Sequence, residues 1–475
     1  MIRSTGALSV RSSHGWSVDA ARFDERSLVS CAGLVPVWSL ATQTGLGPLL
    51  GRVRFRASKV RSGAVNPAGK LACVIAGMTA GADCIDDLEV IRCGGMTTLF
   101  DGVYAPATLG ILLREFAFGH TKQLASAARA HLVALAARTS VLAGADTRTF
   151  IDIDSLLRPV YGYAKQGASF GHTKVSGKQV LRKGLSPLVT TISTPIAAPV
   201  VAGIRLRAGK AGSGKGAATM VTEAIGTARE AVPGCDILVR GDSAFGNSLV
   251  INAAINAGAR FSMVINKDAA VNRAITAMSD DAWTPVHYPG AVTDPDTGEL
   301  ISDAQVAETS YTAFTSINNP VTARLIVRRV RDRNHQDALF PVWRYHPFFT
   351  NNTEPTVEAD ITHRGHAIVE TVFSDLIDGP LAHLPSGRFA ANSAWVICTA
   401  MAHNLLRAAA TLTGPRHAHA RGATLRRRLI NVPARLVKPQ GRAVLRLPAH
   451  WPHAQPWLTL WNDTFRTRHP PPATA

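Results

Sequence analysis

The spacing of apolar residues changes along this chain and divides it into parts of different character. Up to about residue 140, long stretches rich in Ala and Leu, such as TKQLASAARAHLVALAART, have the periodicity of helices. Between residues 145 and 267, short runs of Ile, Leu and Val alternate with longer amphipathic stretches. Short apolar runs of this kind are typical of buried strands. The pattern therefore predicts a helical N-terminal region followed by an α/β core.

The elements predicted within residues 145–267 follow a particular order. Three strand candidates, FIDID, LVTTIST and APVVAGIRLR, precede the amphipathic helix KGAATMVTEAIGTAREAV. The strand DILVRGD, the helix LVINAAINAGA and the strand RFSMVIN come next. This order is expected of a ribonuclease-H-like mixed sheet, in which the first and fourth strands are neighbours. Asp154 lies at the end of the first strand and Asp242 at the end of the fourth, so the two carboxylates are predicted to lie side by side.

The rest of the chain changes character twice more. Residues 268–358 contain turn-rich pieces such as YPGAVTDPDTGEL and alternating pieces such as TARLIVRRVRD, which predict a small antiparallel sheet. Helical periodicity resumes at about residue 359, in ADITHRGHAIVETVFSDLI. His363, His366, Glu370 and Ile377 fall along one side of this predicted helix, because steps of three, four and seven residues return to nearly the same face. The helix can therefore bring Glu370 over the sheet.

The charge of the chain indicates a polyanionic partner. Its 475 residues include 51 Lys and Arg against 33 Asp and Glu, a net charge of +18. A chain this basic attracts a polyanion through counterion release, and nucleic acid is the commonest one. The excess is greatest near the C-terminus, in a stretch that includes Arg426, Arg427 and Arg428. These arginines are predicted to contact DNA, although a solvated basic tail has the same composition.

These patterns predict five parts. They are a helical DNA-binding region at 1–144, the first part of the core at 145–267, a β-rich insertion at 268–358, the rest of the core at 359–414 and a basic C-terminal tail at 415–475. In the first part, VPVWSLATQTGLGPLLGRVRF has two apolar runs around a Gly-centred break. This segment fits either a DNA-reading helix-turn-helix or an ordinary helical hairpin.

Cysteine usage and hydropathy indicate the compartment. The six cysteines form no C-x-x-C pair, which favours reduced, mostly buried thiols of a cytosolic protein. The most apolar late segment, SAWVICTAMAHNLL, contains His403 and Asn404 and is followed by Arg407. We predict a buried helix rather than a membrane span, and no membrane partner.

Three acidic residues have the setting of a metal site. Asp154 in FIDIDS and Asp242 in ILVRGDSAF lie at the ends of predicted strands, and Glu370 lies on a predicted helix. Mg²⁺ prefers hard oxygen ligands, and two such ions can activate an attacking oxygen and stabilise a leaving one at phosphorus. The three residues therefore predict Mg²⁺-dependent chemistry on a phosphate-bearing partner. Asp152, on the same strand face as Asp154, fits either a further metal ligand or a nearby solvated carboxylate.

A near match to a nucleotide-binding motif offers a weaker alternative. GKAGSGKG at 209–216 resembles the phosphate-binding loop G-x-x-x-x-G-K-[ST] and lies between a predicted strand and a predicted helix. Gly216 stands where the Mg²⁺-binding hydroxyl is required. A P-loop ATPase is therefore disfavoured, and the segment is better interpreted as a flexible basic loop that touches DNA.

On these residues, the chain resembles the insertion-sequence 1380 family of bacterial DDE transposases, in the insertion-sequence-4-like group with a β-rich insertion before the catalytic Glu. The resemblance runs from RFDERSLVSCAGLVPV to LPSGRFAANSAWVICTAMAHNLLRAA and includes FIDIDS, YGYAKQGASFGHTK, LVRGDSAFG and HRGHAIVETVFSDLI. It implies an enzyme that binds terminal inverted repeats, cleaves DNA with Mg²⁺ and joins the freed end to target DNA. Mn²⁺ is expected to substitute for Mg²⁺, and a dimer is expected in the DNA complex.

The resemblance assigns the catalytic, metal-binding roles to Asp154, Asp242 and Glu370. The first acid of the family lies in a D-x-T pattern, which Asp154 fits better than Asp152, although Leu156 stands at the Thr position. The related signature Y-x-x-R-x-x-x-E-x-x-x-x-x-x-K departs further. Its Tyr, Arg and Lys positions hold His363, His366 and Ile377.

Other residues are predicted to contact DNA. Protonated His363 and His366 can bind phosphate, and Arg364, Lys165 and Lys174 are further candidates. Trp283 and Trp343 lie in the insertion, where similar transposases have aromatic residues that hold an unstacked base. Each tryptophan also fits the core of the insertion itself. A DNA-binding protein with a decayed catalytic centre and a stand-alone nuclease are the remaining alternatives.

Overall fold

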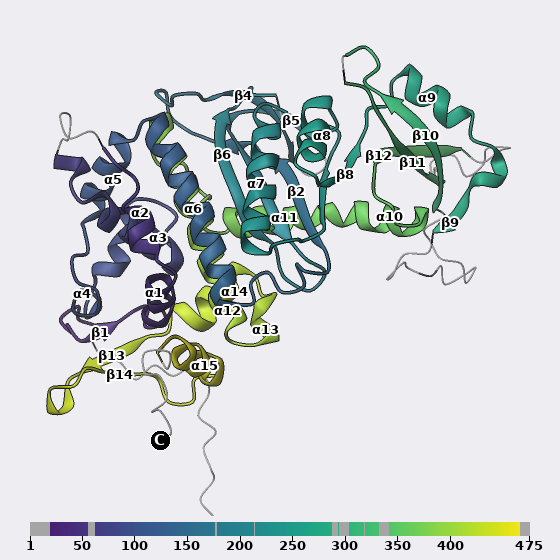
Figure 1. The fold of residues 1–475 in the computed structure, drawn as a ribbon. Coiled ribbons are helices and arrows are strands. Elements are labelled where there is room, and N and C mark those ends of the chain that lie inside the picture. Colours follow the sequence, from purple (N-terminus) through teal and green to yellow (C-terminus); the bar gives the residue numbers. More distant parts are fainter. Residues whose placement is uncertain are drawn as a thin grey trace, which may run out of the picture.

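The computed structural model describes residues 20–55, 62–175, 178–212, 214–286, 293, 304–317, 319–331 and 342–465 (Figure 1). Helices of the N-terminal part lie on one side of a large mixed sheet, and the insertion lies on the other side. The C-terminal segment returns to the N-terminal helices. The fold is therefore of the α/β class, as the sequence predicts.

The N-terminal part is helical. Asn66 caps one helix, because its side chain accepts a hydrogen bond from the Gly69 N–H, and Pro67 occupies the first turn, where no intrahelical partner for an N–H is needed. The helices are α1 (Leu34–Gln43), α2 (Leu46–Leu50), α3 (Pro67–Ala80), α4 (Met96–Leu99), α5 (Pro106–Glu115) and α6 (Phe118–Arg138).

The paired helices α1 and α2 form an ordinary buried hairpin. α2 has 5 residues, LGPLL, and none of them has a side chain that can form a hydrogen bond. Leu46, Leu49 and Leu50 are buried. A recognition helix needs polar side chains that reach base edges. The structure therefore favours the hairpin over the DNA-reading interpretation of this segment.

Five strands form the centre of the sheet, in the order β6-β5-β2-β7-β8. β2 is parallel to β7 and β7 is parallel to β8, whereas β5 is antiparallel to both β2 and β6. The first and fourth predicted strands are thus neighbours, as expected. The strands are β2 (Thr149–Ser155), β5 (Lys178–Ser193), β6 (Val200–Ala208), β7 (Ile237–Gly241) and β8 (Arg260–Val264), and β3 (Arg158–Pro159) and β4 (Ser169–Val175) also pair with β5.

Helices pack around this sheet. α7 (Ala217–Ala231) follows β6, and α8 (Ser248–Asn256) follows β7. α12 (Phe389–Thr411) is buried between β6 and helices α3 and α6, which confirms the buried helix predicted there. Its Asn404 bonds to the N–H and the C=O of Val201 on β6, at 2.8 Å each. No helix in the described ranges is long and apolar enough to cross a membrane.

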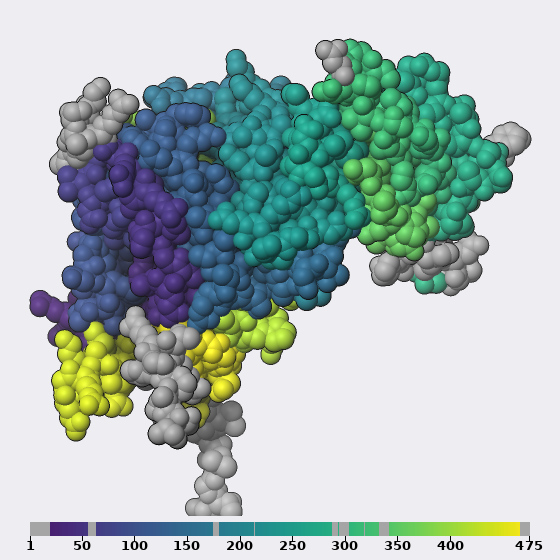
Figure 2. All heavy atoms as spheres, in the orientation of Figure 1, coloured from purple at the N-terminus to yellow at the C-terminus, as the bar shows by residue number. Residues whose placement is uncertain are grey.

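The insertion continues the core sheet. Its strands are antiparallel, as predicted, but β12 pairs with β8, so one sheet runs from the N-terminal helices into the lobe that Figure 2 shows at the far end. Trp283 packs with Val271 and Ile275 of α9 (Ala269–Thr276) in a small core. YPGAVTDPDTGEL lies almost wholly outside the described residues. The strands are β9 (Thr284–Val286), β10 (Ala304–Ala313), β11 (Val321–Arg331) and β12 (Trp343–Thr350).

The helix predicted after residue 359 is divided. α10 (Thr356–Arg364) leads into the 3₁₀ turn η6 (Gly365–Ile368), which leads into α11 (Val369–Ile377). A 3₁₀ turn advances fewer residues per turn than an α-helix, so it rotates the faces on either side of it. His363 is buried and Glu370 is exposed. The prediction that His363, His366, Glu370 and Ile377 lie along one side of a single helix is therefore wrong.

The segment after residue 414 is folded as far as Phe465, which corrects the predicted basic tail. β13 pairs with β1 (Leu28–Val29), and α15 packs against α1, where Ser39 Oγ donates to the Thr464 carbonyl at 3.1 Å. Trp457 and Leu460 are buried, so apolar burial holds this segment despite its charge. Its elements are α13 (Pro415–Ala418), α14 (Gly422–Leu425), a π turn (Arg426–Ile430), β13 (Ala434–Val437), β14 (Val444–Arg446) and α15 (Ala454–Phe465).

Candidate active site

Two of the three candidate carboxylates lie at the ends of adjacent parallel strands. Asp154 is near the end of β2, and its Oδ1 accepts a hydrogen bond from the Ser155 N–H at 2.6 Å. Asp242 directly follows β7, and its Oδ1 accepts the Ala244 N–H at 3.0 Å, which closes a tight turn. Because β2 and β7 are paired in parallel up to this point, both carboxylates lie at the same edge of the sheet.

Glu370 comes from a distant part of the chain. It lies in the first turn of α11 and is exposed, whereas Val369, Val372 and Phe373 of the same helix are buried. Helix α11 contacts β2, the strand that carries Asp154. Strand, strand and helix thus bring the three acids to one region.

The negative charges of Asp242 and Glu370 act on the Asp154 carboxyl group. Burial raises the pKa of Asp154 to about 7, and the charges of Asp242 and Glu370 add to the increase, while the Ser155 N–H opposes it. A carboxylate whose pKa is raised by burial and by neighbouring carboxylates is frequent at functional sites. A divalent cation would remove this repulsion, and carboxylate oxygens are the ligands that Mg²⁺ and Mn²⁺ prefer. The donor set therefore fits such an ion.

The three carboxylates are not tightly gathered in this conformation. Within the described residues, the one group of three His, Cys, Asp or Glu side chains whose ligand atoms all lie within 4.8 Å of one another is Asp83, Cys84 and Asp87. Asp154 and its two partners are more widely spaced than this, so their side chains would move inward when an ion binds.

A family comparison identifies the chain. The model of the transposase DDE domain, group 1, matches residues 13–468, which is nearly the whole length. The chain belongs to this family of DDE transposases. A search of curated proteins gave no match. The family implies an enzyme that cleaves or joins DNA strands, and DDE transposases generally use divalent metal ions. The P-loop ATPase alternative is thereby set aside.

Asp152 of the transposase forms a buried ion pair with Arg240. Its side chain is 1% exposed, and its two oxygens accept hydrogen bonds from Arg240 Nε and Nη2 at 2.7 and 2.9 Å. A buried carboxylate needs such a partner to keep its charge. Both interpretations offered for Asp152, a metal ligand and a solvated carboxylate, are therefore wrong.

His363 is a buried, neutral residue. Its ring stacks on Phe348, with the ring centroids 4.2 Å apart, and its Nδ1 lies 2.8 Å from Ser262 Oγ. Burial lowers the pKa of His363 to about 3. The predicted phosphate contact by His363 is therefore wrong. His366 is half-buried, and its Nδ1 donates to the His363 carbonyl at 2.9 Å, which leaves the contact predicted for it untested.

We predict that acid destabilises the transposase through its buried histidines. His131, bonded to Thr44, is also buried, and burial lowers its pKa to about 4. The folded pKa values of His131 and His363 lie below the unfolded value, so the unfolded state takes up protons first and stability falls as pH drops below about 6.5. The slope is at most roughly 1.4 kcal/mol per pH unit for each histidine.

Urea unfolding of wild type and His131→Gln between pH 7.5 and 5 measures this effect. The His131→Gln variant should show a shallower loss of stability with acid, and His172→Gln, at an exposed position, should keep the wild-type slope. Parallel pH curves for wild type and His131→Gln would contradict the prediction.

The other predicted DNA contacts divide into several cases. Lys165 Nζ donates to the carbonyls of Leu384 and Ser386, at 3.4 and 3.2 Å, so the chain itself already engages this ammonium. Lys174 lies on β4, and its side chain is outside the described residues. Arg364 is exposed at the end of α10. Only Arg364 of these three is described with its side chain on the surface.

The tryptophans of the insertion share one arginine. The Arg329 guanidinium lies 4.3 Å from the Trp283 ring and 4.4 Å from the Trp343 ring. Trp283 is buried in the insertion's small core, which supports the core interpretation for this residue. Trp343 is half-buried and lies on β12. A base that stacks on Trp343 would share the indole ring with Arg329, which already contacts it.

The three adjacent arginines of the C-terminal segment differ in environment. Arg426 is buried, and its Nη1 lies 3.5 Å from the Asp378 carbonyl, so its predicted DNA contact is wrong. Arg427 is exposed and Arg428 is half-buried. The π turn that contains them buries Arg426, Leu429 and Ile430 and leaves Arg427 on the surface. Arg427 and Arg428 therefore keep the predicted role as a proposal.

The loop GKAGSGKG lies between β6 and α7, as predicted, but its carbonyls face a cation. Buried Arg207 donates to the carbonyls of Gly212 and Lys215, at 3.2 and 3.3 Å. A phosphate-binding loop instead turns its N–H groups toward the ligand. This geometry agrees with the family match in disfavouring a nucleotide site here.

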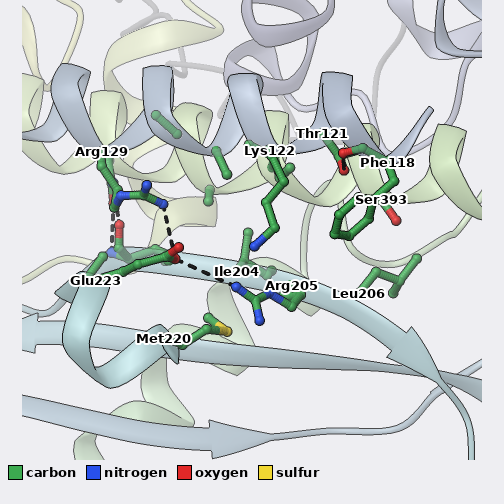
Figure 3. Close-up of a pocket in the computed structure, with 18 of the residues that line it drawn as sticks. Phe118, Thr121, Lys122, Arg129, Ile204, Arg205, Leu206, Met220, Glu223 and Ser393 are labelled. Carbon is green, nitrogen blue, oxygen red and sulfur yellow. Dashed lines mark hydrogen bonds and ion pairs between the residues drawn. The ribbon is translucent and has the colours of Figure 1, made fainter. Parts of the chain in front are cut away.

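A basic rim that the sequence analysis missed, formed by Lys122, Arg129 and Arg205, lies along one part of a mostly apolar hollow between α6, β6, α7 and α12 (Figure 3). Arg129 Nη1 and Arg205 Nη2 lie 3.2 and 3.7 Å from the same Glu223 oxygen, and Lys122 lies beside them. Burial lowers the pKa of Lys122, and the charge of Arg205 lowers it further. Lys122 and Arg129 are two helical turns apart, a spacing that could have revealed a shared basic face.

Proposed function

We propose that this transposase binds the terminal inverted repeats of an insertion sequence, cleaves the DNA at the element ends and joins those ends to target DNA. The observation that carries the proposal is the convergence of Asp154, Asp242 and Glu370, where burial and then the charges of Asp242 and Glu370 raise the pKa of Asp154. The reaction belongs to the class that the family match implies. The resemblance to the insertion-sequence 1380 family supports the choice of substrate.

We infer that the core is ribonuclease-H-like. The order β6-β5-β2-β7-β8, with β5 antiparallel and β2, β7 and β8 parallel, supports this inference. In such a core the first and fourth strands carry acids to one edge. We keep the predicted division of the chain as a proposal, with the DNA-binding region at 1–144 and the insertion at 268–358, and with residues 415–465 folded onto the first part.

Asp154, Asp242 and Glu370 would hold Mg²⁺, or Mn²⁺ in its place. When bound, such ions lower the pKa of water and stabilise charge on the leaving oxygen. The protein supplies the carboxylates at one edge of a rigid sheet and on a helix that packs against it. Asp152 adds no ligand because Arg240 occupies both of its oxygens. We also propose that a dimer forms on DNA, in the bacterial cytoplasm.

The basic rim of Lys122, Arg129 and Arg205 is proposed to contact the DNA backbone. Three cations around Glu223 leave an excess of positive charge, and Arg129 and Arg205 have side chains 24% and 27% exposed. A phosphate placed there would offset the repulsion on Lys122. The partner is therefore a polyanion rather than a neutral small molecule.

Lys122→Gln is expected to weaken binding to DNA of any sequence. If Lys122 contacts one phosphate, its loss should flatten the slope of log affinity against log salt by about 0.9. Arg92→Gln is the matched control, because Arg92 is a surface cation paired with Glu89. Fluorescence anisotropy across a salt series decides the matter, and equal slopes for wild type and Lys122→Gln would remove the rim from the DNA interface.

A catalytically decayed DNA-binding protein is disfavoured, since all three acids persist and converge. The substrate itself can be tested through the DNA that flanks the reading frame. Matched inverted repeats should lie on both sides, and the purified protein should shift these repeats and not scrambled DNA in a gel assay. Absence of any repeat-specific shift would overturn the proposed end recognition.

A further inference from the structure

A row of buried polar residues crosses the sheet beside the carboxylates. Thr191, Asp152, Arg240, Ser262 and Thr350 are partners in register on β5, β2, β7, β8 and β12, so they lie on one line across five strands. Each is at most 3% exposed. Buried polar groups are unfavourable unless they are bonded. The hydrogen bonds of these five residues therefore show which segments of the chain they connect.

Arg240 is the centre of the row. Its Nε and Nη2 donate to the two oxygens of Asp152, and its Nη1 donates to the Thr362 carbonyl at 2.7 Å. The guanidinium also lies over the Phe150 ring, 4.0 Å from the centroid. Its planar fork matches these several acceptors at once, which a lysine ammonium cannot do. One side chain thus joins β2, β7 and the end of α10.

The three segments that Arg240 joins are those that carry the acids. Asp152 lies two residues before Asp154 on β2, and Arg240 itself lies two residues before Asp242. Thr362 lies on the helix that leads through η6 to Glu370. Among the described residues, Arg240 forms no hydrogen bond or ion pair with Asp154, Asp242 or Glu370, so the arginine acts on them through the backbone.

The chain leaves room for this contact. A Cβ on Gly365 would lie 2.7 Å from Arg240 Nη1, so only glycine lets η6 approach the guanidinium without displacing it. Ser262, the next residue of the row, bonds to His363, which fixes the adjacent residue of α10. The row therefore holds the end of α10 at two successive positions.

We propose that Arg240 is a positioning residue that sets the place of Glu370 relative to Asp154 and Asp242. The inference rests on the proposed metal-binding role of these acids. Asp152 then acts as the counterion that stabilises the Arg240 guanidinium in the core. Arg240 touches neither DNA nor the reacting atoms in this role.

The test replaces the buried ion pair by apolar residues. Exchange of a buried ion pair for apolar residues of similar size is often neutral for stability. The double variant Asp152→Leu with Arg240→Met should therefore fold, yet lack the bond to Thr362. Hydrogen exchange of residues 365–377 should accelerate about 10-fold or more, and Mn²⁺ affinity measured by calorimetry without DNA should fall roughly 10–100-fold, the usual range for groups that support metal ligands.

Two further variants make the outcome decisive. Arg240→Lys keeps the charge beside Asp152 but loses the guanidinium fork, so its exchange and its Mn²⁺ affinity should change in the same direction as in the double variant. This variant supplies the test if the double variant does not fold. Thr191→Val is the matched control, because the Thr191 hydroxyl has no hydrogen-bond partner among the described residues and the residue lies in the same row. Its exchange and Mn²⁺ affinity should match wild type.

The readouts separate this inference from the proposed function. Unchanged exchange of residues 365–377 in folded double and Arg240→Lys variants would overturn the positioning role. Faster exchange with unchanged Mn²⁺ affinity would also overturn it, since metal binding by Glu370 would then not depend on the bond from Arg240 to Thr362. A wild-type protein that binds no Mn²⁺ would instead count against the proposed metal site, and the exchange result would still decide whether Arg240 holds the helix.

Discussion

Asp154→Asn, Asp242→Asn and Glu370→Gln are each expected to reduce strand cleavage more than about 100-fold while DNA binding stays near wild type. Loss of a group that merely supports a metal ligand costs about 10–100-fold, so loss of a ligand charge should cost more. Each change keeps the size of the side chain, so the fold should survive. Cleavage assays with Mg²⁺ and gel shifts on the same proteins measure the two effects separately.

Asp154→Asn should also be at least as stable as wild type. Burial and neighbouring charges raise the folded pKa of Asp154 to about 7, so the folded state holds its proton more tightly than the unfolded state does. That contribution to stability is present at low pH and is lost as pH rises through about 7, and Asn removes the dependence. Asp101→Asn, at an exposed position, is the control for the stability measurement.

For the cleavage assay, wild-type cleavage by Asp154→Asn, Asp242→Asn or Glu370→Gln would remove that residue from the metal site.

Removal of residues 415–475 is expected to unfold part of the transposase rather than to weaken DNA binding alone. β1 would lose its partner β13, and α1 would lose α15. Asp375, buried and bonded to Arg407 at 2.7 Å, would lose its second partner Arg421. Each large apolar side chain that is no longer buried costs about 1.5–3 kcal/mol.

Thermal unfolding compares the full chain, the chain ending at residue 414 and a control ending at residue 465. The control should keep the wild-type midpoint. The shorter chain should be insoluble or melt roughly 10 °C lower. It loses several large buried side chains, worth roughly 10 kcal/mol or more together, and each kcal/mol lowers the midpoint by about 1 °C in a chain of this size. An unchanged midpoint with a flatter salt dependence of DNA binding would restore the interpretation of this segment as a solvated tail.

The core strands were predictable because their signal is local. Short apolar runs such as ILV before Asp242 identify a strand without knowledge of its neighbours. The adjacency of β2 and β7 followed from the order of strands and helices, which limits the possible topologies. The same reasoning placed Asp154 beside Asp242, and the sheet register agrees.

Contacts between distant residues were not predictable in this way. Asp152 and Arg240 are 88 residues apart, and periodicity identifies neither as the partner of the other. His363 was predicted to face DNA because helical spacing placed it beside Glu370, but the 3₁₀ turn η6 rotates the two apart. Arg426 was predicted to contact DNA because it lies in a basic stretch, yet it is buried against the Asp378 carbonyl. Charge and spacing describe a residue alone, whereas burial depends on what the fold brings to it.

We propose that these carboxylates catalyse both the cleavage and the joining of DNA. Both activities are tested most directly by incubating the protein with a labelled fragment that ends in the flanking inverted repeat, a supercoiled target plasmid and Mg²⁺. We expect label covalently joined to the target for wild type, and none for Glu370→Gln. Cleaved fragment without joined product would identify a nuclease, and neither product from a protein that binds the repeat would contradict the account.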